Sequence, residues 1–270
     1  PTIPFFVGMQ KLNESDVDGK FTLTYSPTDA HNLFASVARA HITGGFNIVG
    51  GAEFDKSIVY SYEAGLKSSW MDDHIRTQLA AYYQTLSNYQ AQFASPTLGG
   101  QNILQNAEGK SKIYGFEASG QANFGNLNID AALSFMESEL GDFPDVVSPF
   151  LMPPNNVISI SGAKTPFSPK IAVNVGASYN IDFGSFTVTP RADLSHQAKQ
   201  LGALFDAPQT RLPKRTLLNA GVRFTMDNVY VDVWGTNLTD ERYVAGIQDL
   251  GNIWYPGPPR QYGVKVGVNF

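Results

Sequence analysis

The sequence predicts an all-β protein, an antiparallel transmembrane β-barrel with about eleven strands in this chain. Two observations lead to this prediction. Apolar residues alternate with polar or small residues along eleven segments, and the connections between these segments are alternately short and long. Side chains of a strand point to opposite faces in turn, so each segment has one apolar and one polar face. A membrane barrel needs that division, because lipid surrounds it and water fills it.

The last strand, residues 261–270, shows the alternation most clearly. Lys265 lies among small and polar residues on one face, and the other face carries Tyr262, Val264, Val266, Val268 and Phe270. A soluble antiparallel sheet would give the same alternation in a single strand. The prediction therefore depends on repetition along the chain. We expect the apolar face and the terminal aromatic residue to serve as the signal that the barrel-assembly machinery recognises.

Ten earlier segments repeat the alternation. In chain order they are residues 21–25, 32–40, 61–67, 76–84, 114–124, 127–136, 171–179, 186–195, 217–224 and 229–234. Only residues 32–40 are ambiguous, because either set of alternate residues can be assigned to lipid. Aromatic residues of the apolar face lie beside the short connections, at Tyr25, Phe124, Tyr179, Phe224 and Phe270. This placement indicates an aromatic girdle at a membrane interface, whereas a soluble sandwich buries aromatics mid-strand.

The connections give an independent test of the barrel. The short ones are residues 26–31, 70–74, 125–126, 182–185 and 226–228, and they are rich in Pro, Gly, Asn and Asp. The long ones run near residues 41–57, 90–110, 137–168, 197–214 and 240–258. Since every second connection is long, all long loops lie at one end of the sheet. Outer-membrane barrels have short periplasmic turns and long extracellular loops.

Composition excludes several classes of protein. The chain has no cysteine, a net charge of −5 and a mean hydropathy of −0.16. Thiol chemistry is therefore absent, general nucleic-acid binding is disfavoured, and no run of about 18 apolar residues predicts a membrane-spanning helix. The four histidines are scattered, so we expect neither a metal site nor a cofactor. Ser195 and His196 are adjacent and point to opposite faces, so we expect no enzyme.

The chain has the features of part of a longer barrel. Eleven is an odd number, whereas single-chain bacterial barrels have even strand numbers. We expect residues 1–19 to be the end of an extracellular loop and residues 20–270 to be the C-terminal portion of a barrel. An exported protein also needs a signal peptide, and the sequence opens without one at Pro1.

Four stretches resemble TonB-dependent outer-membrane receptors. The first is Phe21-Thr-Leu-Thr-Tyr-Ser-Pro-Thr-Asp29 with residues 32–47 after it, and the second is Ser61-Tyr-Glu-Ala-Gly-Leu-Lys-Ser-Ser-Trp70. The third is Asn237-Leu-Thr-Asp-Glu-Arg-Tyr243, and the fourth runs from Gly257-Pro-Pro-Arg-Gln-Tyr to Phe270. Their order, spacing and C-terminal aromatic residue together carry the resemblance, which covers nearly the whole chain.

The resemblance implies a function beyond what the strands indicate. Such receptors have a twenty-two-stranded barrel in the bacterial outer membrane, closed by an N-terminal plug. They import a scarce nutrient, often a ferric siderophore, with energy passed through TonB to an N-terminal segment that this sequence does not contain. A passive porin and a surface-binding structural barrel remain the alternatives. A plug and TonB-binding segment upstream would favour the receptor, and their absence would favour the alternatives.

Ligand contacts are expected from lumen-facing residues near the extracellular rim and from the long loops. Aromatic rings stack on flat ligands, and the arginine fork binds carboxylates or an anionic ferric chelate. The candidates are Arg39, His41, Asn88, Tyr89, Arg242, Tyr243, Trp254 and Tyr255. Each of them also has a simpler interpretation, as a rim aromatic or a loop-packing residue.

Overall fold

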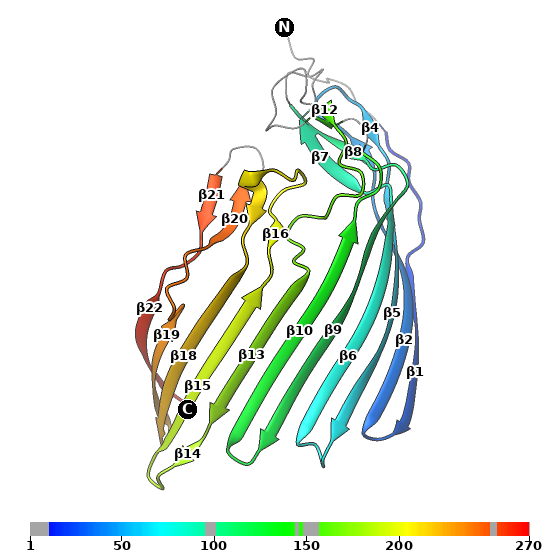
Figure 1. Cartoon of the computed structure of the whole chain (residues 1–270). Helices are drawn as coiled ribbons and strands as arrows, with labels where there is room; N and C mark the ends of the chain where they lie inside the picture. The colour runs from blue at the N-terminus through cyan, green and yellow to red at the C-terminus, as the bar shows by residue number, and fades with distance from the viewer. Residues whose placement is uncertain (1–10, 95–100, 144–145, 148–156, 249–252, 270) are drawn as a thin grey trace.

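A computed structural model describes residues 11–94, 101–143, 146–147, 157–248 and 253–269 of the chain. Long antiparallel strands form one curved sheet, here called the wall, in which each strand pairs with its neighbours in the chain (Figure 1). They are β1 (Gly19–Thr28), β2 (His31–Ile42), β5 (Ser57–Trp70), β6 (Ile75–Ser87), β9 (Lys110–Phe124), β10 (Leu127–Glu139), β13 (Ile171–Tyr179), β15 (Thr187–Gln197), β18 (Arg215–Met226), β19 (Val229–Thr236) and β22 (Gln261–Val268).

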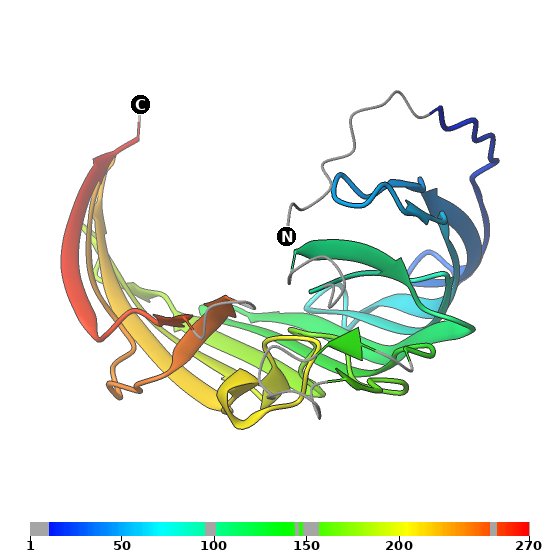
Figure 2. The ribbon, with the colours of Figure 1, turned by 90° about the horizontal axis from the view of Figure 1, so that it is seen from above.

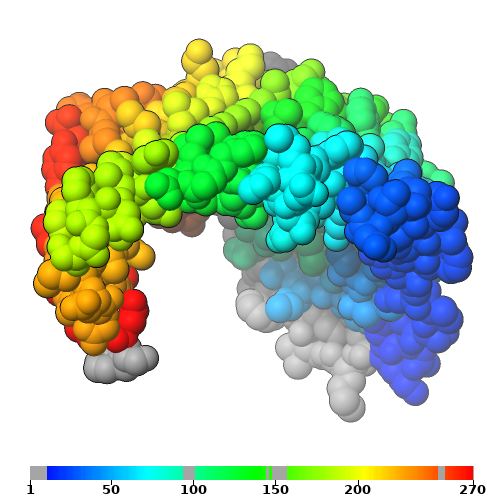
Figure 3. Space-filling view, turned by 90° about the horizontal axis from the view of Figure 1, so that it is seen from below, coloured from blue at the N-terminus to red at the C-terminus, as the bar shows by residue number. Residues whose placement is uncertain are grey.

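The predicted count of eleven wall strands is confirmed. A further two-residue strand, β14 (Ile181–Asp182), continues the line of β13 and pairs with the start of β15. Seen from above, the wall is an open half-cylinder, with β1 along one edge and β22 along the other (Figure 2). Seen from below, its concave side is a broad hollow (Figure 3). The described residues contain no helix that could cross a membrane.

The predicted alternation of connections is also confirmed. Short turns join the strands at one end, and positive backbone φ angles occur there at residues that tolerate them, among them Asp72, Gly125 and Asp227. The long connections at the other end carry small strands. These are β3 (Gly45–Phe46), β4 (Glu53–Phe54), β7 (Gln90–Ala94), β8 (Asn102–Asn106), β11 (Val146–Val147), β12 (Val157–Ile158), β16 (Gln200–Leu201), β17 (Arg211–Leu212), β20 (Val244–Gln248) and β21 (Ile253–Pro256), with a 3₁₀ turn at Pro208–Thr210.

The pairing register assigns the ambiguous residues of β2. Leu33 pairs with Leu66, Ala35 with Ala64 and Val37 with Tyr62, and directly paired residues share a face. The odd-numbered residues of β2 therefore lie on the apolar face of the wall, here called the outer face. The even-numbered residues, including Phe34, lie on the polar inner face, where the ring of Phe34 covers Gly65.

The outer face has aromatic residues at both ends of its apolar band. Tyr25, Phe124, Tyr179 and Phe224 are exposed beside the short turns, as predicted. A second group, which the sequence analysis missed, is the cross-strand row Tyr62, Tyr83 and Tyr114 near the long loops. Ten residue steps separate Tyr114 from Phe124, about 34 Å of strand. At a tilt of about 40° this spans about 25 Å along the membrane normal, the height of a typical apolar band.

The inner face near the C-terminus combines rings with glycines. The ring of Tyr230 lies against Gly267, where an added Cβ would come within 2.3 Å of it. The same ring lies beneath two cations, the Arg223 guanidinium at 4.6 Å and the Lys265 ammonium at 5.7 Å from its centroid. Glycine at position 267 is therefore required for the ring to lie flat on the wall.

The C-terminal strand presents its apolar side chains outward. Val264 and Val266 are 67% and 66% exposed on the face that pairs with Val233 and Val231 of β19. Tyr262 and Val268 belong to the same exposed series, and Phe270 lies outside the described residues. An apolar stripe at the edge of the wall is consistent with the assembly signal expected from the sequence, which stays a prediction.

Substitutions on β22 test the two faces. We expect Val266→Lys to lower the yield of assembled barrel much more than Lys265→Leu, because a lipid-facing charge near mid-membrane costs roughly 2–4 kcal/mol. The measurement is the heat-modifiable folded fraction in outer membranes. Equal yields for the two variants would show that the faces are assigned incorrectly.

Candidate functional site

The long connections pack together above the wall instead of standing as separate loops. Phe93 of β7 is 2% exposed, and its ring lies 5.1 Å from that of Phe143 and 6.0 Å from that of Phe205. The buried cluster, here called the extracellular head, consists of Ala91, Phe93, Ala107, Leu140, Phe143, Val146, Ile160, Leu204 and Phe205. Three successive connections contribute to it, so the head is a small hydrophobic core on top of a membrane wall.

A four-stranded sheet gives the head its shape. Its order is β12-β11-β7-β8. β11, from the connection between β10 and β13, pairs with β7, from the connection between β6 and β9. An isolated bridge between Glu108 and Asp142 ties the same two connections at their base. From above, β7 and β8 lie over the concave side of the wall (Figure 2). The head thus covers part of the concave side of the wall at its long-loop end.

Asn88 and Tyr89 have structural contacts within the head. Asn88 adopts a positive φ of 54°, its amide donates to the Lys56 carbonyl, and its own carbonyl accepts hydrogen bonds from Ser57 and Asn106. Tyr89 packs against the buried cluster, and this burial raises the pKa of its phenol. The polar groups of Asn88 are therefore already used in positioning the loop, and its role in ligand binding stays untested.

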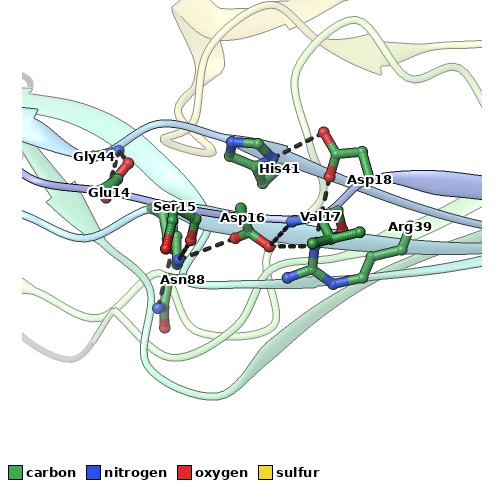
Figure 4. Close-up of polar contacts among 10 residues, drawn as sticks. Glu14, Ser15, Asp16, Val17, Asp18, Arg39, His41, Gly44 and Asn88 are labelled. Carbon is green, nitrogen blue, oxygen red and sulfur yellow. Dashed lines mark hydrogen bonds and ion pairs between the residues drawn. The ribbon is translucent and has the colours of Figure 1, made fainter.

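Arg39 and His41 lie on the outer face, so their expected position in the lumen is wrong. Arg39 pairs with Tyr60 across the strands and lies over its ring at 5.9 Å. Both side chains bind the extended segment before β1 (Figure 4). Arg39 contacts Asp16 at 2.6 Å, His41 contacts Asp18 at 2.8 Å, and Lys56 contacts Asp16 at 3.0 Å. The β2 register, which was ambiguous in sequence, decides this placement.

The segment Glu14–Asp18, here called the strap, is held by charge. The Asp16 side chain is only 8% exposed, and hydrogen bonds from Arg39 and then Lys56 hold its pKa well below the usual carboxyl range. Glu14 accepts a hydrogen bond from the backbone of Gly44 at 3.2 Å. Oxygen and nitrogen atoms of Asp16, Asp18 and His41 lie within 4.8 Å of one another. However, two cations already neutralise Asp16, so the group functions as an ion-pair network.

The remaining candidates gather in the connection before β22. Tyr243 lies beneath the Arg215 guanidinium at 4.9 Å, and Arg242 is exposed beside it. Trp254 and Tyr255 of β21 are each 52% exposed, and the Tyr255 hydroxyl donates to Gln248 of β20. Four of the eight candidates thus lie in the connection before β22, whereas Arg39 and His41 lie on β2 near the other edge of the wall (Figure 1). Arg215 is a stacking partner that the sequence analysis missed, because its contact is long-range.

The inner face of the wall is lined with charge. Arg191 contacts Asp130 at 2.9 Å and also pairs with Asp193 beside it, and Arg223 makes a two-pronged pair with Asp232. Toward the short turns, a trough of about 590 Å³ is lined by polar groups that include Lys67, Arg76 and Asp130. Such a surface can hold water or a polar protein segment, and it contrasts with the apolar band that covers the middle of the outer face.

Comparison with known proteins identifies the family. The model of the TonB dependent receptor-like β-barrel matches residues 6–238. The chain belongs to the TonB-dependent receptor family. The resemblance noted in the sequence is thereby confirmed, as are the β-barrel fold and the outer-membrane location that members of this family share. The family consists of transport receptors, which agrees with the expectation that the chain is not an enzyme.

Individual relatives within the TonB-dependent receptors are distant. The chain is 24% identical over 252 residues to the metal-pseudopaline receptor CntO of Pseudomonas aeruginosa, covering 91% of the chain and 32% of that receptor. It is 23% identical over 236 residues to the ferric-pyoverdine receptor PbuA of Pseudomonas sp. strain M114, covering 84% and 26%. Among solved structures, the ferric yersiniabactin uptake receptor FyuA of Yersinia pestis superposes with a TM-score of 0.74 at 20% identity, covering 94% and 37%. The chain therefore spans about a third of the proteins it resembles.

The head core gives the first prediction for this site. We expect Phe93→Ala to destabilise the packed head by about 3–5 kcal/mol, because it removes a buried ring and leaves a cavity. Hydrogen exchange of the amides of β7 and β8 measures this opening. Phe183→Ala, at an exposed turn on the opposite end of the wall, is the matched control. Unchanged exchange in Phe93→Ala would contradict a cooperative head.

The strap gives a second prediction. Because the pKa of Asp16 is lowered on docking, the contribution of this residue is complete above its unfolded pKa of about 3.9 and is lost only as pH falls through the lower folded value. We therefore expect the strap to stay docked from pH 7 to about pH 4 and to detach in stronger acid. Asp16→Asn should release it at pH 7, measured by protease cleavage within residues 11–18. Asp227→Asn, at a distant turn, is the control, and equal cleavage of both variants would contradict the charge-held strap.

Proposed function

We propose that this chain forms the C-terminal half of the wall of a receptor that imports a ferric siderophore or a related metal chelate, with energy supplied through TonB. Family membership carries the proposal, since TonB-dependent receptors are transporters energised in this way. The relatives named for metal-pseudopaline and ferric-pyoverdine indicate the class of cargo. Family membership also favours this function over a passive porin or a structural surface barrel.

The architecture fits a gated receptor. The head narrows the entrance above the lumen, the connection before β22 supplies exposed aromatic rings, and the inner face offers fixed charges. In this mechanism the extracellular side binds the chelate, a plug contributed by the N-terminal part of the receptor opens, and the polar inner face lets the chelate pass. No covalent bond is made or broken. We propose residues 20–270 as the barrel portion and residues 1–19 as the end of an extracellular loop.

Trp254 and Tyr255 are the aromatic contacts to test first. Adjacent residues of a strand point to opposite faces of the hairpin, so only one of them can face the bound chelate. We expect one of the single variants Trp254→Ala and Tyr255→Ala to weaken binding by about 1 kcal/mol, about fivefold, through loss of a stacking contact. The other should bind as wild type does.

The assay is binding and uptake of radioactive ferric chelates by cells that produce the whole receptor. Phe183→Ala, remote from the extracellular side, is the matched control. Uptake that requires TonB supports the receptor. Uptake that continues without TonB would support a passive channel, and wild-type binding by both aromatic variants would remove the β21 hairpin from the binding site.

A further inference from the structure

A basic cavity lies at the rim of the wall, between the tops of β10 and β15. Its volume is about 610 Å³, and its lining includes three lysines and one arginine. The charged residues that line it are Glu137, Lys164, Lys170, Lys199, Asp206 and Arg211. Neither the ligand-binding proposal nor the head explains this concentration of positive charge.

The register of β10 places Glu137 on the outer face, whereas Met136 and Ser138, which also line the cavity, belong to the inner face. Glu137 pairs with Tyr114, and two residues earlier Phe135 pairs with Phe116, all on the lipid-facing side of the wall. The Lys170 ammonium lies 5.3 Å from the centroid of the Phe135 ring and 2.6 Å from a Glu137 carboxylate oxygen. Lys164 pairs with the other oxygen of Glu137. The two lysines and Glu137 therefore face the membrane side of the wall.

The cavity begins where the apolar band ends. Along the outer face of β10, Phe135 is the last apolar residue and Glu137 is the first charged one. The same change occurs on β9 between Tyr114 and Lys112. Aromatic rings mark the level where hydrocarbon gives way to polar headgroups. The basic cavity thus lies at the headgroup level of the outer leaflet.

The charges in the cavity do not cancel. Its four cations exceed its two carboxylates, Glu137 and Asp206, by two. Glu137 is paired with both Lys164 and Lys170, and the lining as a whole keeps an excess of two positive charges. The Lys164 and Lys170 side chains are still 55% and 59% exposed, so each ammonium can accept a second anion. Lys199 adds a third ammonium to the lining.

We propose that this cavity binds the phosphate of an anionic glycolipid headgroup in the outer leaflet. Lysine binds phosphate as a compact point charge, and basic pockets at the membrane surface recognise phosphorylated headgroups. The acyl chains of such a lipid would continue downward along the exposed apolar face at Phe135 and Leu133. The inference depends on the outer-membrane location of the chain and is independent of which nutrient the receptor imports.

The test uses the whole receptor purified from outer membranes in detergent. Native mass spectrometry measures the retention of added lipid A, a glycolipid with two phosphates, against lipid A from which the phosphates have been removed. We compare wild type with the triple variant K164Q/K170Q/K199Q. The matched control is K110Q/K112Q, which removes two rim lysines outside the cavity lining.

We expect wild type and the control to retain the phosphorylated lipid and the triple variant to bind it roughly a hundredfold more weakly. This follows from a loss of roughly fivefold for each lysine near the surface. A second variant, Glu137→Gln, removes the carboxylate that competes with the lipid phosphate for Lys164 and Lys170. It should bind the phosphorylated lipid more tightly, by about fivefold, which a purely structural role for Glu137 does not predict.

Three results would overturn the proposal. One is wild-type binding by the triple variant, and another is equal retention of lipid A with and without its phosphates. The third is displacement of the lipid by inorganic phosphate at equal concentration, which would mean that the site takes free phosphate. If the triple variant does not assemble, Glu137→Gln decides the question, because a variant that binds no more tightly than wild type contradicts the assignment.

Discussion

The structure depends on one constraint, that every backbone polar group inside hydrocarbon must find its partner within the protein. The wall meets this constraint through long ladders between successive strands, such as the thirteen paired positions that join β5 to β6. Among the described strands, β1 and β22 are the two edges of the wall that have no neighbouring strand. The strands of the head can be short and irregular, because water above the membrane can form hydrogen bonds with the backbone N–H and C=O groups that they leave unpaired.

The two faces follow from the same ladders. Once the pairing register is fixed, alternate residues of each strand face lipid and lumen. A slip of one residue would turn every side chain of that strand to the opposite face. On the inner face, Arg223 and Lys265 lie over the ring of Tyr230. On the outer face, the apolar band ends toward the long loops at charged residues such as Glu137 and Arg39. Both of these residues are then neutralised by groups that lie outside the regular strands.

Much of the wall could be predicted from the sequence, because its signal is local. Alternation within each strand and the turn residues between strands identified the eleven wall strands and their two ends. The phase of β2 could not be predicted, because Phe34 is apolar yet faces the lumen, where it covers Gly65. Only the cross-strand partners of its neighbours show this. The tyrosine row of β5, β6 and β9 was missed for a related reason, since it forms only once three strands are in register.

The candidate site was harder to predict than the wall. Residues of the long loops have no periodicity, so nothing local indicates that Phe93, Phe143 and Phe205 meet. Asn88 looked like a polar loop residue available to a ligand, whereas its hydrogen bonds hold two connections together. The ion pairs of Asp16 join residues more than twenty positions apart. In each case the decisive contact is between segments that are distant in the sequence.

The order of the wall strands has a consequence for how such a structure is built. Among the described wall strands, each pairs with the wall strands before and after it, so pairing within this half of the wall needs no distant partner. The wall can therefore grow one hairpin at a time, with a single advancing edge. The head core draws residues from three connections, so it can pack only after the wall strands that hold those connections have paired.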